Sequence, residues 1–360
     1  MLKNRRRKMK GATFFSKEER LESLSNRGES KFLNELNRII PWESFRPILQ
    51  RIRKGDGSKG GRPPFDEILM LKCLILQTIH GFSDEETEYR ILDSIIYSHF
   101  LGIEAPSDVP DSNTIWLFRE KLQKQNLIEK VFYKFYAILQ DNGLEIRKGM
   151  IVDATFVTVP KQRNTREENA SIKSGEMPES FKTKTVQERN HKDIDARWTR
   201  KGGVRFFGFK NHIGVSERTK IIRSYGVTSS SVHDSKMILH LLRDTDVENI
   251  PIYADSAYYS AEILSNLKNL GYIPKICEKG YSGTPLTERQ KVRNSKISHI
   301  RARVEHVFGY MVQHGGKSIR TIGIERAKAK IGLMNLVYNM ARTLILIPKS
   351  RKKSFQFTIT

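Results

Sequence analysis

Cysteine is almost missing from this 360-residue sequence: the two present, Cys73 and Cys277, stand far apart in the chain. That spacing fits neither a disulfide framework nor a clustered zinc site, and it favours a reducing compartment. Long apolar runs are missing too, because Lys72 interrupts the longest one, Ile68–Leu76, which is far shorter than the ~20 residues of a membrane span. Residues 1–11 are basic but precede charged sequence, so we expect no secretory signal and a cytoplasmic location.

Acidic residues are scarce: 40 Asp and Glu face 63 Lys and Arg, which gives a formal net charge of +23. This balance argues against an ordinary metabolic enzyme and favours a polyanionic partner. The excess of positive charge lies near the two ends of the sequence. Residues 1–60 contain 16 basic and 7 acidic residues, and residues 286–360 contain 16 basic and 3 acidic residues. Clustered Lys and Arg neutralise phosphates, so we expect a nucleic acid. A solubilising surface, or contact with a ribosome or membrane surface, is the alternative.

Residues 1–147 are predicted to form an all-helical N-terminal domain. Pro63 and Pro64 precede an apolar helix that begins near Asp66 and ends at Gly81. Further helix starts are indicated by a capping-box pattern at Ser83 and Glu86, by Asp111 or Ser112, and by apolar residues at four-residue spacing from Leu127 until Gly143. Such short helices can present one helix to a DNA major groove, or serve only as scaffold or for assembly. Both interpretations stay open.

Residues 148–347 are predicted to form a mixed α/β domain with a central sheet, followed by a basic tail at 348–360. Apolar and β-branched runs indicate strands at Met150–Val159, Val204–Gly214, Ile221–Thr228, Ile250–Ala254 and Tyr272–Cys277. Helices are expected at Ser235–Arg243, Ser260–Leu270, Ser298–Gln313 and after Gly323, the last closing this domain or joining a dimer. The alternation of these predicted strands and helices along the sequence is typical of a mixed α/β fold. Residues 160–203 are polar and charged and are predicted to be a long surface insertion.

Two aspartates lie in or directly after predicted buried strands, Asp153 in IVDAT and Asp255 in IYADSAY. Burying an unpaired carboxylate costs several kcal/mol, so each needs a partner. At a strand end the pair can hold a divalent cation, or each can cap a helix or a turn. Arg301 and Glu305 stand one helical turn apart, so Glu305 can reach the same site or form a plain surface pair with Arg301.

Asp153, Asp255 and Glu305, in the order strand, strand, helix, resemble the acidic triad of the bacterial DDE transposases, most closely the insertion sequence 5 family. The resemblance covers about residues 40–345 through RPPFDEILMLKCLILQTIHGFSDEETEYRILDS, PDSNTIWLFREKL, VDATFV, DIDARWTRKGG, FGFKNHI, TSSSVHDS, ADSAYYS and RARVEHVFGYM. Several blocks in the same order are more specific than three acids alone. The family pattern Tyr-x2-Arg-x3-Glu-x6-Lys is incomplete, because Ser298 and Val312 stand at the tyrosine and lysine positions.

This resemblance implies a ribonuclease-H-like fold in which Asp153, Asp255 and Glu305 are catalytic and bind two Mg²⁺ or Mn²⁺ ions. It implies metal-dependent cleavage and strand transfer at the ends of an insertion sequence. The implied partners are double-stranded DNA, as terminal inverted repeats and target, and further copies of the chain in a homodimer or higher oligomer. The implied location is the bacterial cytoplasm, at the nucleoid. A nuclease without strand transfer and an inactive DNA-binding derivative are the alternatives.

DNA contacts are predicted from basic and aromatic residues near the motifs and at the N-terminus: Arg301, Arg303, Lys317, Arg320, Arg197, Trp198, Arg200, Lys201, Arg5, Arg6 and Arg7. Lys317 or Arg320 is expected to replace the missing lysine near Glu305. Trp198 either stacks on an unpaired base or packs in the core. The three N-terminal arginines enter a minor groove, follow phosphates or form a solvated tail.

Overall fold

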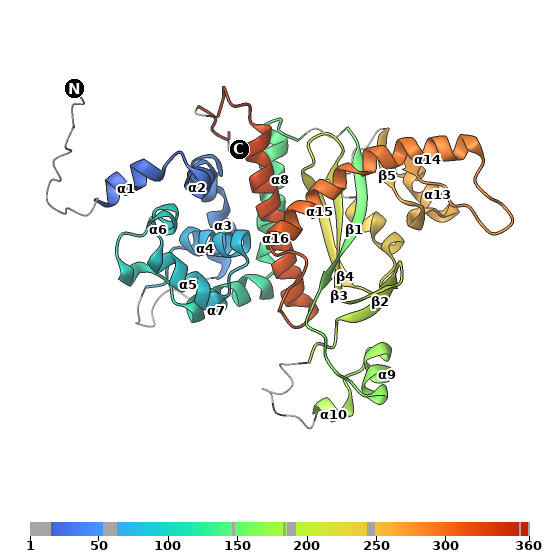
Figure 1. Cartoon of the computed structure of the whole chain (residues 1–360), viewed down its shortest axis with the longest axis horizontal. Helices are drawn as coiled ribbons and strands as arrows, with labels where there is room; N and C mark the ends of the chain where they lie inside the picture. Colours follow the sequence, from blue (N-terminus) through green and yellow to red (C-terminus); the bar gives the residue numbers. More distant parts are fainter. Residues whose placement is uncertain are drawn as a thin grey trace, which may run out of the picture.

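The computed structural model describes residues 16–52, 63–145, 148–182, 185, 192–242, 249–352 and 354–358. In Figure 1 a group of helices lies on one side of the long helix α16, and a sheet with further helices lies on the other. None of the helices in these ranges has the length and apolar character needed to cross a membrane. The predicted DNA contacts Arg5, Arg6 and Arg7 lie outside the described residues.

The described residues before the sheet form a series of helices. Its elements are α1 (Lys17–Leu24), α2 (Gly28–Ile39), η1 (Trp42–Phe45), α3 (Arg46–Leu49), η2 (Gln50–Ile52), α4 (Glu67–His80), α5 (Asp84–Asp93), α6 (Ile95–Leu101), η3 (Pro106–Asp108), α7 (Ser112–Lys124) and α8 (Leu127–Asp141), where η denotes a 3₁₀ helix. Asp66 caps α4 by accepting hydrogen bonds from two backbone amides, and α4 ends at Gly81 with φ +72°. Both predicted ends of this helix are therefore confirmed.

The capping box predicted for α5 is only half formed. The Ser83 hydroxyl accepts a hydrogen bond from the Glu86 amide at 3.0 Å. The Glu86 carboxylate instead accepts one from Arg90 Nε at 2.6 Å, so it does not return to the Ser83 amide. At α7, Asp111 rather than Ser112 is the cap, and it accepts from the Thr114 amide.

The second part contains a mixed six-stranded sheet. Its strands are β1 (Met150–Thr158), β2 (Arg197–Lys201), β3 (Val204–Ser216), β4 (Ile222–Ser229), β5 (Ile250–Ala254) and β6 (Tyr272–Ile276). β3 is antiparallel to β1, β2 and β4, whereas β5 is parallel to both β1 and β6. The predicted mixed α/β character is confirmed, and the bounds of β5 match the prediction at both ends.

The remaining elements are α9 (Arg166–Ser174), α10 (Glu179–Lys182), η4 (Asp234–Met237), α12 (Ile238–Leu241), η5 (Ser256–Tyr258), α13 (Ala261–Asn269), α14 (Glu288–Arg301), α15 (Arg303–Gln313) and α16 (Ile324–Leu346). The structure differs from the sequence prediction in three places. The described part of residues 160–203 includes the helices α9 and α10 and the strand β2, which joins the sheet through β3. The helix predicted at 235–243 is a 3₁₀ turn followed by one short helix, and the helix predicted at 298–313 is divided at Ala302.

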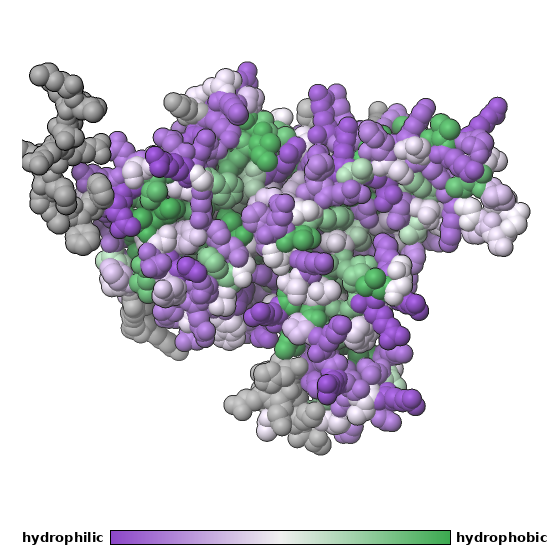
Figure 2. Space-filling view, in the orientation of Figure 1, coloured by the Kyte–Doolittle hydropathy of each residue, from purple (hydrophilic) through white to green (hydrophobic). Residues whose placement is uncertain are grey.

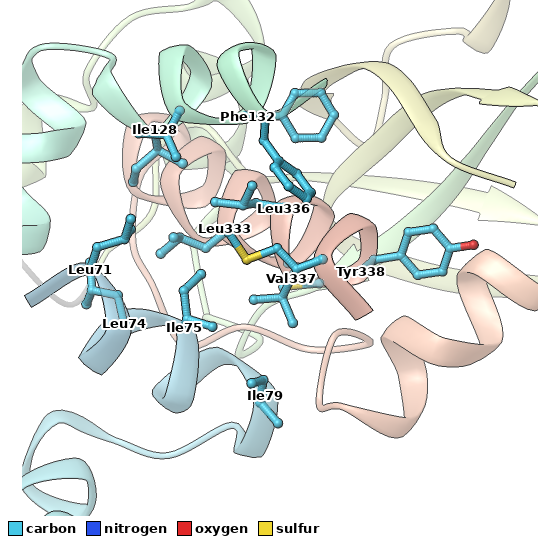
Figure 3. Close-up of a cluster of buried hydrophobic side chains, with 14 of the residues drawn as sticks. Leu71, Leu74, Ile75, Ile79, Ile128, Phe132, Leu333, Leu336, Val337 and Tyr338 are labelled. Atoms are coloured by element: carbon cyan, nitrogen blue, oxygen red, sulfur yellow. The ribbon is translucent and has the colours of Figure 1, made fainter. Parts of the chain in front are cut away.

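Helix α16 packs between the two parts. Its side chains meet those of α4 and α8 in the cluster of Figure 3, where the labelled residues are Leu71, Leu74, Ile75, Ile79, Ile128, Phe132, Leu333, Leu336, Val337 and Tyr338. Polar contacts fix the other side of the helix: Asn335 and Asn211 exchange hydrogen bonds at 2.8 and 3.2 Å, and Asn339 binds the backbone of Ile222. One buried cluster therefore extends across the predicted boundary at 147–148.

Candidate active site

The parallel register of β1 and β5 sets two aspartates side by side. Ile151 of β1 pairs with Tyr253 of β5. Asp153 comes two residues after Ile151, and Asp255 comes two residues after Tyr253. Neighbouring strands lie about 4.7–4.9 Å apart, so this register brings the two side chains to one place on the sheet. Asp153 is within β1, and Asp255 follows the last residue of β5.

One oxygen of each aspartate binds local backbone. Asp153 Oδ1 accepts a hydrogen bond from the Ala154 amide at 2.8 Å. Asp255 caps η5, because its Oδ1 accepts from the Ala257 amide at 2.9 Å. The capping role predicted for Asp255 is therefore confirmed. These backbone contacts use only Oδ1 of each aspartate, so Oδ2 is available for another partner.

Arg301 is the shared partner of these two Oδ2 atoms. Its Nη2 lies 2.9 Å from Asp153 Oδ2 and 3.8 Å from Asp255 Oδ2. The Asp153 and Arg301 side chains are each 18% exposed, and that of Asp255 is 28% exposed. Burial raises the pKa of Asp153, an effect that the Arg301 charge and the Ala154 amide oppose and the nearby Asp255 reinforces.

Glu305 does not join the two aspartates. It is exposed on the first turn of α15, and its carboxylate makes neither a hydrogen bond nor an ion pair with another described residue. Arg301 is the last residue of α14, and its side chain pairs with Asp153 of the sheet. The plain surface pair between Arg301 and Glu305 therefore does not form. Within the described ranges, no group of three or more His, Cys, Asp or Glu residues is arranged to hold a metal ion.

Two further residues near this site were missed in the sequence. Tyr258 of η5 is 1% exposed, and its hydroxyl has no hydrogen-bond partner. Burial raises its pKa well above the usual value, and the charges of Asp153, Asp234 and Asp255 add to the shift. Asp234 accepts from Lys210 Nζ at 2.8 Å, in the turn η4 that packs against η5. Asp234 lies in the motif TSSSVHDS and Tyr258 in the motif ADSAYYS. Their place in these motifs is the sequence signal that could have identified them.

Arg197 and Trp198 on β2 have different environments. The Arg197 guanidinium donates to the backbone carbonyls of Ile172 and Ala196 at 2.7 and 3.2 Å, so it ties α9 to the strand. Trp198 is 46% exposed, and its ring centroid lies 5.1 Å from that of Phe207. The core-packing interpretation of Trp198 is therefore wrong, because nearly half of the side chain faces solvent.

Exposed basic residues surround Trp198. Lys161 Nζ lies 5.8 Å from the centroid of its ring. An open hollow of about 430 Å³ is lined by Trp198, Thr199, Arg200 and Arg205. Lys201, also exposed, lies over the ring of Phe156. On the face shown in Figure 2, hydrophilic side chains gather around the lower end of the sheet and project along α14.

The other predicted DNA contacts are dispersed. Arg303 is exposed and donates to the Glu217 carbonyl at 2.8 Å. Lys317 is exposed beyond the far end of α15, and its carbonyl accepts from the Thr158 amide. Arg320 lines a separate hollow of about 210 Å³ on α7 and α16. The expectation that Lys317 or Arg320 lies near Glu305 is thus not met, because the length of α15 separates them.

Two family models match this chain, and one solved structure is similar to it. Residues 19–121 match a family described as a transposase domain (DUF772). A solved structure described as a cryo-EM structure of the piggyBac transposase synaptic complex with hairpin DNA has 11% identity and a TM-score of 0.42, over 93% of this chain and 75% of that chain. Residues 145–340, more than half of the chain and including Asp153, Asp255 and Glu305, match the family described as transposase DDE domain. The chain therefore belongs to the transposase DDE domain family.

Proposed function

We propose that this transposase binds the ends of an insertion sequence and cleaves and joins DNA at Asp153 and Asp255, with Glu305 as the third acid. The observation that carries the proposal is the register of β1 and β5, which sets the two aspartates side by side within the segment matched by the family. The strand directions support a ribonuclease-H-like fold, since antiparallel β4, β3 and β1 are followed by parallel β5 and β6.

Members of the family use divalent metal ions, and the residues here fit such an ion in part. Carboxylate oxygens suit hard cations such as Mg²⁺ or Mn²⁺, and the Oδ2 atoms of Asp153 and Asp255 both face one position. Glu305 stays outside, and a guanidinium occupies the position between the aspartates. In the proposed two-ion site Glu305 is the third carboxylate ligand, so that site requires a different position of Glu305 from the one described.

We also propose that the β2–β3 hairpin contacts DNA. Arg200, Lys201 and Arg205 are exposed, and none forms an ion pair with a described acidic residue. Uncompensated positive charge beside a half-exposed indole is the combination that holds phosphates and stacks on an unpaired base. Arg197 is not part of this proposal, because its guanidinium binds backbone carbonyls.

Supercoiled donor DNA that carries the element ends, incubated with Mg²⁺, tests the proposed function. The wild-type protein should give cut and joined products, and Asp153→Ala, Asp255→Ala and Glu305→Ala should each abolish both while DNA binding persists. Cutting without joined products would instead support a nuclease, and binding alone would support an inactive derivative. Sizing of the protein–DNA complex tests the homodimer or higher oligomer that processing of two ends favours.

A further inference from the structure

A single guanidinium lies between the oxygens that a cation would use. The Oδ1 atoms of Asp153 and Asp255 bind the amides of Ala154 and Ala257. The two Oδ2 atoms face Nη2 of Arg301, at 2.9 and 3.8 Å. Among the described residues, no other Lys, Arg or His forms an ion pair with either aspartate. Arg301 is therefore the sole counter-ion of the pair in this part of the chain.

A divalent cation and this guanidinium cannot both occupy the position between the aspartates. Like charges a few ångströms apart repel strongly where solvent is largely excluded, and all three side chains are less than one third exposed. The hydroxyl of the neighbouring Tyr258 is buried without a partner and carries no charge that offsets the repulsion. Cation binding at Oδ2 therefore requires Arg301 to leave.

Arg301 is placed where a change of partner is feasible. It is the last residue of α14, and Ala302 divides it from α15, which begins at Arg303. Its Nε is buried without a hydrogen-bond partner, so only part of its donor set is used. A planar guanidinium binds phosphate through two parallel hydrogen bonds, and a DNA phosphate supplies the negative charge that Arg301 loses on leaving the aspartates.

We propose that Arg301 is an internal counter-ion of Asp153 and Asp255 in the DNA-free protein, and that a DNA phosphate takes Arg301 away and so permits a divalent cation to bind. This inference rests on the proposed function and adds a coupling to it. DNA binding raises cation affinity at the two aspartates, and by linkage the cation raises DNA affinity by the same factor.

Mn²⁺ binding to the full chain without DNA, followed by the electron paramagnetic resonance signal of free Mn²⁺, tests the counter-ion role. Arg301→Ala should bind Mn²⁺ at least about tenfold more tightly than the wild type, and Arg301→Lys, which keeps the charge, should stay near the wild type. Arg293→Ala is the matched control, because Arg293 lies on the same helix but pairs with Glu278. Equal or weaker Mn²⁺ binding by Arg301→Ala, or tighter binding by Arg301→Lys, would overturn the proposal.

Two further measurements separate folding and function from this result. Asp153→Asn combined with Arg301→Ala should lose the added Mn²⁺ affinity, which locates it at the aspartates, and thermal unfolding shows that each variant is folded. A short duplex should tighten Mn²⁺ binding in the wild type and far less in Arg301→Ala, and an equal effect on both would contradict the exchange of partners. None of these readouts needs DNA cleavage, so the proposed function can fail in the donor-DNA assay independently.

Discussion

Asp153 and Arg301 form a 2.9 Å ion pair across 148 positions of the chain. The contact joins the end of α14 to the central strand β1, and it turns Arg301 away from Glu305. The sequence predicts that Asp153, Asp255 and Glu305 form one site, but in this structure Glu305 lies apart from the two aspartates. Two carboxylates share a guanidinium, and the third acid stands exposed on the next helix.

Substitution of the two aspartates should separate catalysis from DNA binding. Asp153→Asn and Asp255→Asn keep the side-chain shape but remove the charge, and we expect cleavage to fall by at least about a hundredfold, the scale for losing a pre-organised electrostatic group. DNA affinity should not fall, because neither side chain belongs to the exposed basic surface and the loss of a carboxylate charge leaves Arg301 easier for a phosphate to bind. Cleavage and gel-shift assays on the same preparations measure both, and undiminished cleavage by either variant would exclude that aspartate from the site.

Leu336→Ala should destabilise the whole chain. Leu336 is fully buried on α16, in the cluster of Figure 3 that also includes side chains of α4 and α8. Truncating such a leucine costs about 2–5 kcal/mol of unfolding free energy. Because one core serves both parts, we expect a single unfolding transition, lowered as a unit in urea titrations followed by circular dichroism and fluorescence. Two transitions, with only one of them shifted, would show that the parts fold separately.

Local signals accounted for much of the fold. Asp66 and Gly81 mark the ends of α4 because a cap and a left-handed residue are needed at those positions whatever the rest of the chain does. The apolar run of β5 likewise gave its bounds. Strand β2 was missed because its side chains are mostly exposed and show no apolar period. The signal for it was Gly202-Gly203, both with positive φ, which forms the tight turn into β3.

The site depends on contacts that a local pattern does not contain. The sequence indicated that Asp153 and Asp255 would meet, because strand-borne carboxylates gather at one sheet margin. It did not indicate the break at Ala302, since alanine is the best helix former and nothing nearby marks an end. That break decides that Arg301 contacts the aspartates while Glu305 remains exposed.

Lys330 should make stability depend on pH in the alkaline range. Burial lowers the pKa of this lysine to about 8 from 10.5, and the neighbouring Arg119 charge adds to the effect while Asp84 opposes it. Between these values the unfolded chain binds a proton that the folded chain has lost, so the unfolding free energy should rise as pH increases from 8 to 10.5. Lys330→Met should remove this contribution in urea titrations across that range.

The control for Lys330 is Lys328, on the same helix. It is about half exposed and pairs with Glu325 at 2.7 Å. Lys328→Met should keep the wild-type pH dependence. Identical curves for Lys330→Met and the wild type would show that Lys330 keeps its proton in the folded chain.

Trp198 should contribute to binding of DNA that contains an unpaired base. Stacking of a base on an aromatic side chain contributes about 1–3 kcal/mol, so Trp198→Ala should weaken binding of a duplex with one unpaired base by roughly tenfold, and of the fully paired duplex much less. Trp198→Phe should restore most of the difference. Trp116→Ala is the matched control, because Trp116 is 44% exposed, close to the 46% of Trp198, but lies on α7. Fluorescence anisotropy with the two duplexes measures the difference, and an equal loss on both would mean that the indole only supports the hairpin.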